Sequence, residues 1–200
     1  MIRLIRKIAA VTGLTALSAC VLVAPNRAAT FGDGALFLQA PAGYCVDTVA
    51  SRPSDDFAVL APCATLGVRT AAPDVVGLIT IKADDPGTGD IATDEIALRD
   101  FLITDAGKAL LSQSGSAEDV SILSTQAFDD QVMVHFSDQG APPLDGLQDQ
   151  EWRAFRNLGG RLITIGVRGL AAAPLQDGPG ASLLKLVIAG FEDTTEAPAS

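Results

Sequence analysis

The 200-residue chain is poor in the residues that build metal sites and bind polyanions. It has one histidine, His135, and no Cys-x-x-Cys pair, which argues against a zinc site. Beyond the first seven residues it has no cluster of Lys or Arg, and its formal net charge is −10. A chain this acidic repels phosphate groups, so we exclude nucleic acid as a partner.

Sequence motifs of common catalytic sites are also missing. The serine segments at 113–118 and 180–184 lack the G-x-S-x-G spacing of a nucleophile elbow, and the glycine-rich pieces at 32–37 and 87–92 lack the third glycine of a dinucleotide fingerprint. The acidic stretch 84–90 does not have the spacing of a calcium loop, and we interpret it as a surface turn. We therefore predict no catalytic residue, no metal and no cofactor.

The first residues have the pattern of a secretory leader. Arg3, Arg6 and Lys7 precede an uncharged apolar run of seventeen residues, Ile8 to Ala24, which is at the short limit for a membrane-spanning helix. Because no acidic residue occurs in 1–19, removing that segment leaves 11 basic against 24 acidic residues, a formal charge of −13. The pattern predicts export through the general secretory route.

The end of this run, Leu17-Ser18-Ala19-Cys20, resembles the lipobox of bacterial lipoproteins. The resemblance implies that the leader is cut before Cys20 and that this cysteine carries a lipid. Two alternatives stay open. Leu22-Val23-Ala24 is an acceptable site for an ordinary signal peptidase, and the run can also remain as an uncleaved anchor.

The other two cysteines form a natural pair once the lipobox cysteine is set aside. Strand-like segments at 44–49 and 57–63 flank a cluster of turn-forming residues. A hairpin centred on Ser54 places Cys45 opposite Cys63, so we predict a disulfide between them. The alternative is two unpaired buried thiols.

The remaining chain predicts an α+β fold with a mainly antiparallel sheet, because its strands are joined by short polar turns. Thr93 is expected to cap an amphipathic helix over 94–113, and 181–191 reads as a closing helix. The apolar stripe of the first helix is Leu98, Phe101, Leu102, Ala109 and Leu110. Hairpins are expected at Asp129-Asp130 and at 157–160.

This order of elements is similar to the Mog1/PsbP-like superfamily, which includes periplasmic lipoproteins. The likeness rests on the opening "LQAPAGYCVD", which leads directly into a hairpin, and on a last helix that ends in "VIAGFED". It covers about residues 35–193. The resemblance implies a single α+β domain and a binding or assembly role, since members of the superfamily have several unrelated roles of that kind.

A local excess of positive charge in the third hairpin marks a candidate ligand site. Trp152, Arg153, Arg156 and Arg161 gather there, followed by Arg168. Arginines near one end of a sheet can clamp a carboxylate or phosphate, and they can equally neutralise neighbouring acids, which we favour.

His135 lies in "VMVHFSD", where Val132, Val134 and Phe136 alternate with it, so we place it on a polar face. An alternative function is a small periplasmic hydrolase or transferase that uses His135 with a carboxylate such as Asp138.

We expect four segments: a leader (1–19), a tether (20–34), one α+β domain (35–193) and a disordered tail (194–200). The predicted protein is a non-catalytic binding or assembly module. It is lipid-anchored on the periplasmic side of a cell envelope, with the membrane and an envelope protein as partners. A soluble periplasmic protein is the alternative.

Overall fold

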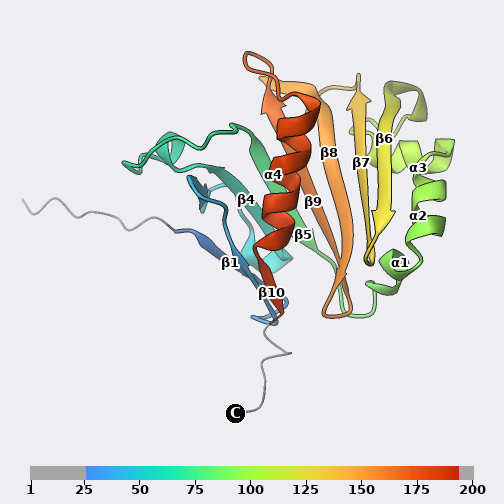
Figure 1. Ribbon diagram of the computed structural model, residues 1–200, viewed down its shortest axis with the longest axis horizontal. Coiled ribbons are helices and arrows are strands. Elements are labelled where there is room, and N and C mark those ends of the chain that lie inside the picture. Colours follow the sequence, from blue (N-terminus) through green and yellow to red (C-terminus); the bar gives the residue numbers. More distant parts are fainter. Residues whose placement is uncertain (1–25, 194–200) are drawn as a thin grey trace, which may run out of the picture.

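A computed structural model describes residues 26–193 of the chain, except for the side chains of residues 91, 93 and 193. The predicted leader, Cys20 and the C-terminal tail lie outside these described residues. Ten strands and four α-helices make up this part (Figure 1). The strands are β1 (Ala28–Phe31), β2 (Leu36–Gln39), β3 (Tyr44–Val46), β4 (Phe57–Pro62), β5 (Leu78–Ala83), β6 (Val120–Phe128), β7 (Gln131–Asp138), β8 (Leu147–Leu158), β9 (Arg161–Leu170) and β10 (Phe191–Asp193). The helices are α1 (Asp90–Thr93), α2 (Glu95–Leu102), α3 (Asp105–Leu111) and α4 (Asp177–Ala189).

The strands form two sheets in which every neighbouring pair is antiparallel, so the predicted α+β class is confirmed. The main sheet has the order β3-β4-β5-β9-β8-β7-β6, and the small sheet has the order β1-β2-β10. Helix α4 lies across one face of the main sheet, over β8 and β9 (Figure 1). Helices α2 and α3 pack near the β6 end of that sheet, and the short α1 contacts β7, β8 and β9.

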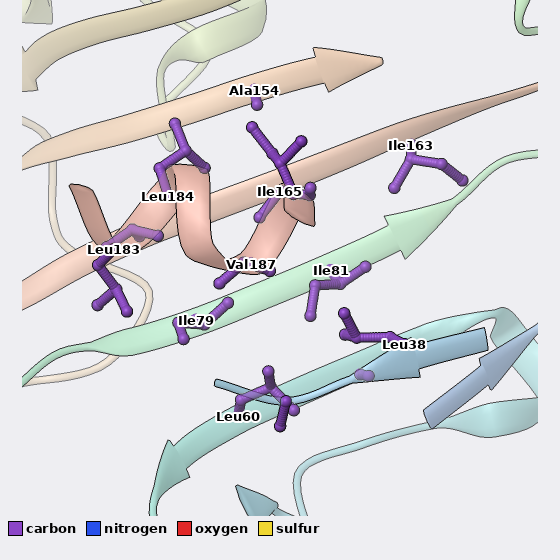
Figure 2. Close-up of a cluster of buried hydrophobic side chains, with 14 of the residues drawn as sticks. Leu38, Leu60, Ile79, Ile81, Ala154, Ile163, Ile165, Leu183, Leu184 and Val187 are labelled. Carbon is purple, nitrogen blue, oxygen red and sulfur yellow. The ribbon is translucent and has the colours of Figure 1, made fainter. Parts of the chain in front are cut away.

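A large aliphatic core fills the space between the main sheet, α4 and the small sheet. Alternate residues of β5 and β9 face it, and Ile79 pairs with Val167 while Ile81 pairs with Ile165. Figure 2 shows Ile79, Ile81 and Ile165 on the side of the sheet that faces Leu183, Leu184 and Val187 of α4. Because such side chains each contribute roughly 1.5–3 kcal/mol when buried, this core is the main source of stability.

A smaller core lies on the opposite face, beneath α2 and α3. Val132, Val134 and Phe136 of β7 point into it and meet Leu102 and Leu111 from the helices. The sheet is therefore covered on both faces in this region. As a consequence β7 is buried along almost its whole length, including the residues that the sequence places on a polar face.

Two hairpin turns agree with the sequence. Asp129 and Asp130 join β6 to β7 with φ of 52° and 55°, and Gly159 and Gly160 join β8 to β9 with φ of 56° and 73°. Two consecutive left-handed residues match the twist of the flanking strands, and Asp and Gly are among the residues that accept this conformation.

The Cys45–Cys63 disulfide is present, but the predicted strand register is wrong. Cys45 pairs with Ala61, so Cys63 lies two positions further along, just after β4 and on the same side. The Cα atoms of the two cysteines are 4.8 Å apart, within the range that a disulfide requires. The pairs of β3 with β4 are centred on Pro53 and not on Ser54, and within the connecting loop Arg52 forms a bridge with Phe57.

The single helix expected over 94–113 is broken in two. Asp94, and not Thr93, caps α2 by accepting the amide of Ala97 at 3.1 Å. Thr104 then ends this segment and caps α3 through the amide of Gly107 at 3.2 Å. A serine, threonine or aspartate side chain that binds a first-turn amide starts a new helix efficiently.

The break changes which side chains are buried. Leu110, assigned to the apolar stripe, is 70% exposed, whereas the next residue, Leu111, is buried. Gly107 lies against the backbone of Phe101 and Leu102, where a Cβ atom would clash, so this glycine allows α3 to pack closely on α2.

Residues 28–34, assigned to a tether, belong to the folded body. β1 pairs with β2 over four residues, and Phe31 is buried against the large core. The strand has no alternating pattern of its own, and its one buried residue, Phe31, lies against Phe191 of β10, which comes from the other end of the chain.

Candidate functional site

A pocket of about 630 Å³ opens between β6, β7 and β8 and the first turns of α4. Its size lies within the range of small-molecule sites. The lining combines apolar and polar side chains. They are Leu123, Ser124, Gln126, Met133, Val134, His135, Gln150, Trp152, Asp177, Gly178, Ala181 and Leu184.

A stacked pair of aromatic rings forms the floor of this pocket. His135 and Trp152 are cross-strand partners on β7 and β8, and their ring centroids lie 4.2 Å apart with an interplanar angle of 11°. Both side chains are buried. Stacking over this distance fixes the orientation of the imidazole ring within the sheet.

Both ring nitrogens of His135 face oxygen atoms. Nε2 lies 3.2 Å from Oε1 of Gln150, and Nδ1 lies 3.9 Å from Oδ1 of Asp177 at the start of α4. The Asp177 side chain is 87% exposed, so it stands at the mouth of the pocket and not in its interior. These partners hold the imidazole at the boundary between the sheet and the helix.

Gly180 lets α4 approach this floor closely. A Cβ atom at position 180 would stand 2.5 Å from the ring of Trp152, whereas one at Gly178 would meet nothing within 4 Å. The first turn of α4 therefore rests directly on the indole at Gly180 and leaves open space beside Gly178. That open space is part of the pocket.

A bulge in β6 shapes the opposite wall. The pairing with β7 shifts between Ile122 and Ser124, so Leu123 is an extra residue and Ser124 lies opposite His135. Bulges of this kind redirect side chains next to functional sites. Here the bulge brings both Leu123 and Ser124 to the pocket.

The described contacts of His135 do not pair it with a nucleophile. Ser124 is a neighbour of His135, but both ring nitrogens are directed at Gln150 and Asp177, and no hydrogen bond joins the serine to the ring among the described contacts. Nucleophilic catalysis needs the hydroxyl and the base within hydrogen-bond reach. Within residues 26–193, no group of three His, Cys, Asp or Glu side chains is placed to hold a metal ion.

The sequence-predicted ligand residues are spread over both faces of the sheet. Trp152 lies in the pocket, and Arg156 is on the same face, 3.5 Å from the carbonyl of Ile188. Arg153 is on the opposite face, bound to Glu151 at 2.6 Å.

Arg161 lies at another place again, at the start of β9. Its Nη1 donates to the carbonyl oxygen of Asp84 at 2.9 Å and lies 3.7 Å from the carboxylate of Asp56. The four predicted residues therefore do not form one clamp.

The sequence missed two features of the site. His135 is buried, not on a solvent-facing polar surface, because α4 covers its face of the sheet. Asp138 points to the opposite face and accepts the amides of Gln113 and Gly140, so it cannot partner His135. Asp177 takes that place, and its position at the start of an apolar helix was the available signal.

Comparison with known proteins gives the fold. Neither a family model nor a curated protein matches the sequence. The structure resembles that of a point mutant of the protein Mog1, with a TM-score of 0.51 and 12% identity over 85% of this chain and 97% of that one. At this identity the likeness establishes the fold alone, and it supports the predicted resemblance of the body at that level.

Two other solved structures are less similar. The Ran-binding protein Mog1p of Saccharomyces cerevisiae has a TM-score of 0.49 and 12% identity, over 84% of this chain and 95% of that one. Cyanobacterial PsbP from Synechocystis has a TM-score of 0.42 and 14% identity, over 90% of this chain and 99% of that one.

Among the described residues, no helix is both long and apolar enough to cross a membrane.

Proposed function

We propose that this protein is an exported, non-catalytic binding module that holds a small ligand in the pocket between β6–β8 and α4. The observation that carries the proposal is the stacked His135–Trp152 floor, with polar side chains converging on a cavity of about 630 Å³. An apolar cavity with a few fixed polar groups is the usual form of a small-molecule site.

The charges of the lining indicate the class of ligand. Among the described residues that line the pocket, Asp177 carries the single carboxylate, and no Lys or Arg is present. The whole chain is acidic as well. A neutral or cationic ligand with an apolar, preferably aromatic, body therefore fits better than an anion.

Trp152 is the only tryptophan of the chain, so its fluorescence reports on this pocket alone. We would titrate the purified protein with 2-phenylethylamine and with 3-phenylpropionate, which differ mainly in charge. The amine is expected to change the emission of Trp152 at lower concentration than the acid. An unchanged emission with both probes contradicts the proposal.

A pair of helix variants tests the location. Ala181→Leu adds a large side chain inside the pocket, whereas Ser182→Leu adds the same side chain on the exposed side of α4. Leucine favours helices, so neither change disturbs α4 itself. The first variant is expected to abolish the response to the amine and the second to preserve it; an equal response in both places the ligand elsewhere.

Membrane attachment through a lipid on Cys20 is the second part of the proposal. The lipobox-like leader supports it, and the Cys45–Cys63 disulfide is compatible with an oxidising compartment outside the cytoplasm. The intact mass of the protein from a bacterial membrane fraction tests this directly. A mass for residues 20–200 plus lipid is expected, and a soluble species that starts near Pro25 contradicts the anchor.

A hydrolase that uses His135 receives less support. Its predicted partner Asp138 is on the other face of the sheet, and Ser124 has no hydrogen bond to the imidazole among the described contacts. Binding of an envelope protein is a separate part of the proposal. Recovery of a stoichiometric partner with the anchored protein would support it.

A further inference from the structure

A second cavity, of about 220 Å³, lies on the opposite face of the main sheet. It is bounded by β4, β5, β8 and β9, with walls from the segments after α3 and after β7. Phe57, Leu78 and Pro143 give it an apolar rim, and Glu151, Arg153 and Arg168 bring three charges to it. It shares no lining residue with the pocket beneath α4.

The three charged side chains form one buried cluster. Nε of Arg153 lies 2.6 Å from Oε1 of Glu151, and Nε of Arg168 lies 2.7 Å from Oε2 of the same carboxylate. The side chains of Glu151 and Arg168 are only 5% and 6% exposed. Two cations therefore share one anion, which leaves one unit of positive charge in a poorly hydrated place.

The donors of Arg168 are not all satisfied. Its Nη1 donates to the carbonyl oxygen of Gln148 at 3.3 Å. Its buried Nη2 forms a close ion pair with Oε2 of Glu151 at 2.6 Å, but no acceptor is aligned well enough with its N–H groups for a hydrogen bond. A buried donor without a partner is costly, and an anionic oxygen is the acceptor that would satisfy a guanidinium best.

Arg153 has its own contacts at the edge of the cluster. Its guanidinium lies over the ring of Phe136 at 5.1 Å, and Nη1 makes a long contact of 3.4 Å with the carbonyl oxygen of Leu111. The carboxylate of Asp138 accepts the amides of Gln113 and Gly140, and among the described contacts the ion pairs of Arg153 and Arg168 are with Glu151.

The sheet is built around this cluster. A Cβ atom at Gly166 would stand 2.8 Å from Oε1 of Glu151 and 2.8 Å from Oγ1 of Thr80, so a glycine in β9 provides the room for the carboxylate. The pairing of β8 with β9 also shifts between Leu147 and Glu151. A glycine inside a strand and an interrupted ladder both occur where a strand makes space for another group.

We infer that this cavity binds the carboxylate of a small ligand with a short apolar group, and that Arg168 and Arg153 are the residues that hold it. The ligand carboxylate would balance the second guanidinium, and its apolar group would lie against Phe57 and Leu78. A free short-chain acid and the C-terminal end of a peptide share this chemistry. The inference does not depend on the ligand of the other pocket.

The first test uses the full-length protein in detergent and isothermal titration calorimetry. The probes are 4-methylpentanoate and its uncharged isostere 4-methylpentanamide. The acid is expected to bind at least about tenfold more tightly than the amide, because charge-assisted bonds to a guanidinium need the anion. Equal affinity for the two probes, or no binding of the acid, overturns the inference without any variant.

A second pair of probes identifies the source of the carboxylate. The peptide Gly-Gly-Leu is compared with its C-terminal amide. Preferential binding of the free peptide supports the site and assigns it to chain ends. Binding of 4-methylpentanoate but not of the peptide supports the site and assigns it to small acids.

Variants then locate the site. Arg168→Lys keeps the charge but loses the planar donor pair, and it is expected to weaken binding of the acid by about tenfold. Arg99→Lys makes the same change at a partly exposed arginine of α2 and serves as the matched control, with unchanged affinity. Asp177→Asn, in the other pocket, is also expected to leave the affinity unchanged. An Arg168→Lys protein that folds and binds the acid normally overturns the assignment.

Discussion

The two faces of the main sheet are built from the same strands and differ in what covers them. On one face a thirteen-residue helix, α4, and the small sheet enclose a continuous aliphatic core. On the other, two short helices, α2 and α3, cover β6 and β7 with a smaller core. The part of this second face that the short helices do not cover carries the cluster of Glu151, Arg153 and Arg168.

This difference shows that a sheet can be stabilised mainly from one side. The α4 face provides most of the buried apolar area, so polar groups are tolerated at the edge of that core and on the open part of the other face. Both cavities lie at such boundaries, one where α4 begins and one where the cover of the short helices ends. Four predictions test this comparison, in order of decreasing effect.

Shortening a side chain of α4 should have the largest effect. Leu184→Ala removes a fully buried side chain from the large core and is expected to lower the free energy of unfolding by about 3–4 kcal/mol. Leu186→Ala, two residues away and 57% exposed, should change it by less than about 0.5 kcal/mol. Urea unfolding measures both; similar losses in the two variants would mean that α4 is not the main cover.

The equivalent change on the other face should cost less. Leu111→Ala is expected to lower the free energy of unfolding by about 2–3 kcal/mol, because its core is smaller and the short helix can settle into the gap. The neighbouring Leu110→Ala is the control, since that side chain is largely exposed. A loss as large as that of Leu184→Ala would contradict the proposed difference between the faces.

Adding a methyl group where α4 meets the sheet should have an intermediate effect. Gly180→Ala brings a Cβ atom against the ring of Trp152 and is expected to cost about 2 kcal/mol and to shift the tryptophan emission. Gly178→Ala meets no neighbouring atom and should be neutral or slightly stabilising. Thermal unfolding and fluorescence of the two variants separate the steric effect from helix propensity.

Tyr44 gives the smallest effect at neutral pH and a distinct one in base. Burial raises the pKa of Tyr44 to about 12, while the hydrogen bond from the amide of Gly77 acts in the opposite direction. Because the folded-state pKa exceeds the usual 10, this contribution to stability is complete below pH 10 and is lost as the pH rises through 12.

The test compares the wild type with Tyr44→Phe. At pH 7 the variant should be less stable by about 1 kcal/mol, since it loses the bonds of the hydroxyl to Val75 and Gly77. Between pH 10 and 12 the wild type should lose stability more steeply than the variant. If the stability of the two proteins falls in parallel over this pH range, burial does not raise the pKa of Tyr44, and the prediction is wrong.

Local sequence signals were enough for much of this fold. The turn pairs Asp129-Asp130 and Gly159-Gly160 indicated the positions of two hairpins. Once Cys20 is set aside, two cysteines remain, and this even number indicated the Cys45–Cys63 disulfide. The predicted register of the first hairpin was wrong because the two cysteines do not lie opposite each other. Cys45 pairs with Ala61, and Cys63 lies two positions later, beyond the end of its strand.

What the sequence could not provide are contacts between distant segments. His135 seemed to lie on a polar face because β7 alternates, but α4, some forty residues later, covers that face. Asp177 reaches the histidine for the same reason. Arg153, Arg156 and Arg161 are neighbours in the sequence, yet the alternation of β8 and the turn after it separate them in space.

The order of strands in the main sheet has a consequence for how the chain acquires its structure. β5 pairs with β9, about eighty residues later, and β2 in the small sheet pairs with β10 at the end of the described chain. Contacts this distant in sequence form slowly, since a long loop must close first. The two halves of the sheet cannot join until the last third of the chain is available. During synthesis, the first half of the sheet therefore stays incomplete until residues 161–170 have been made.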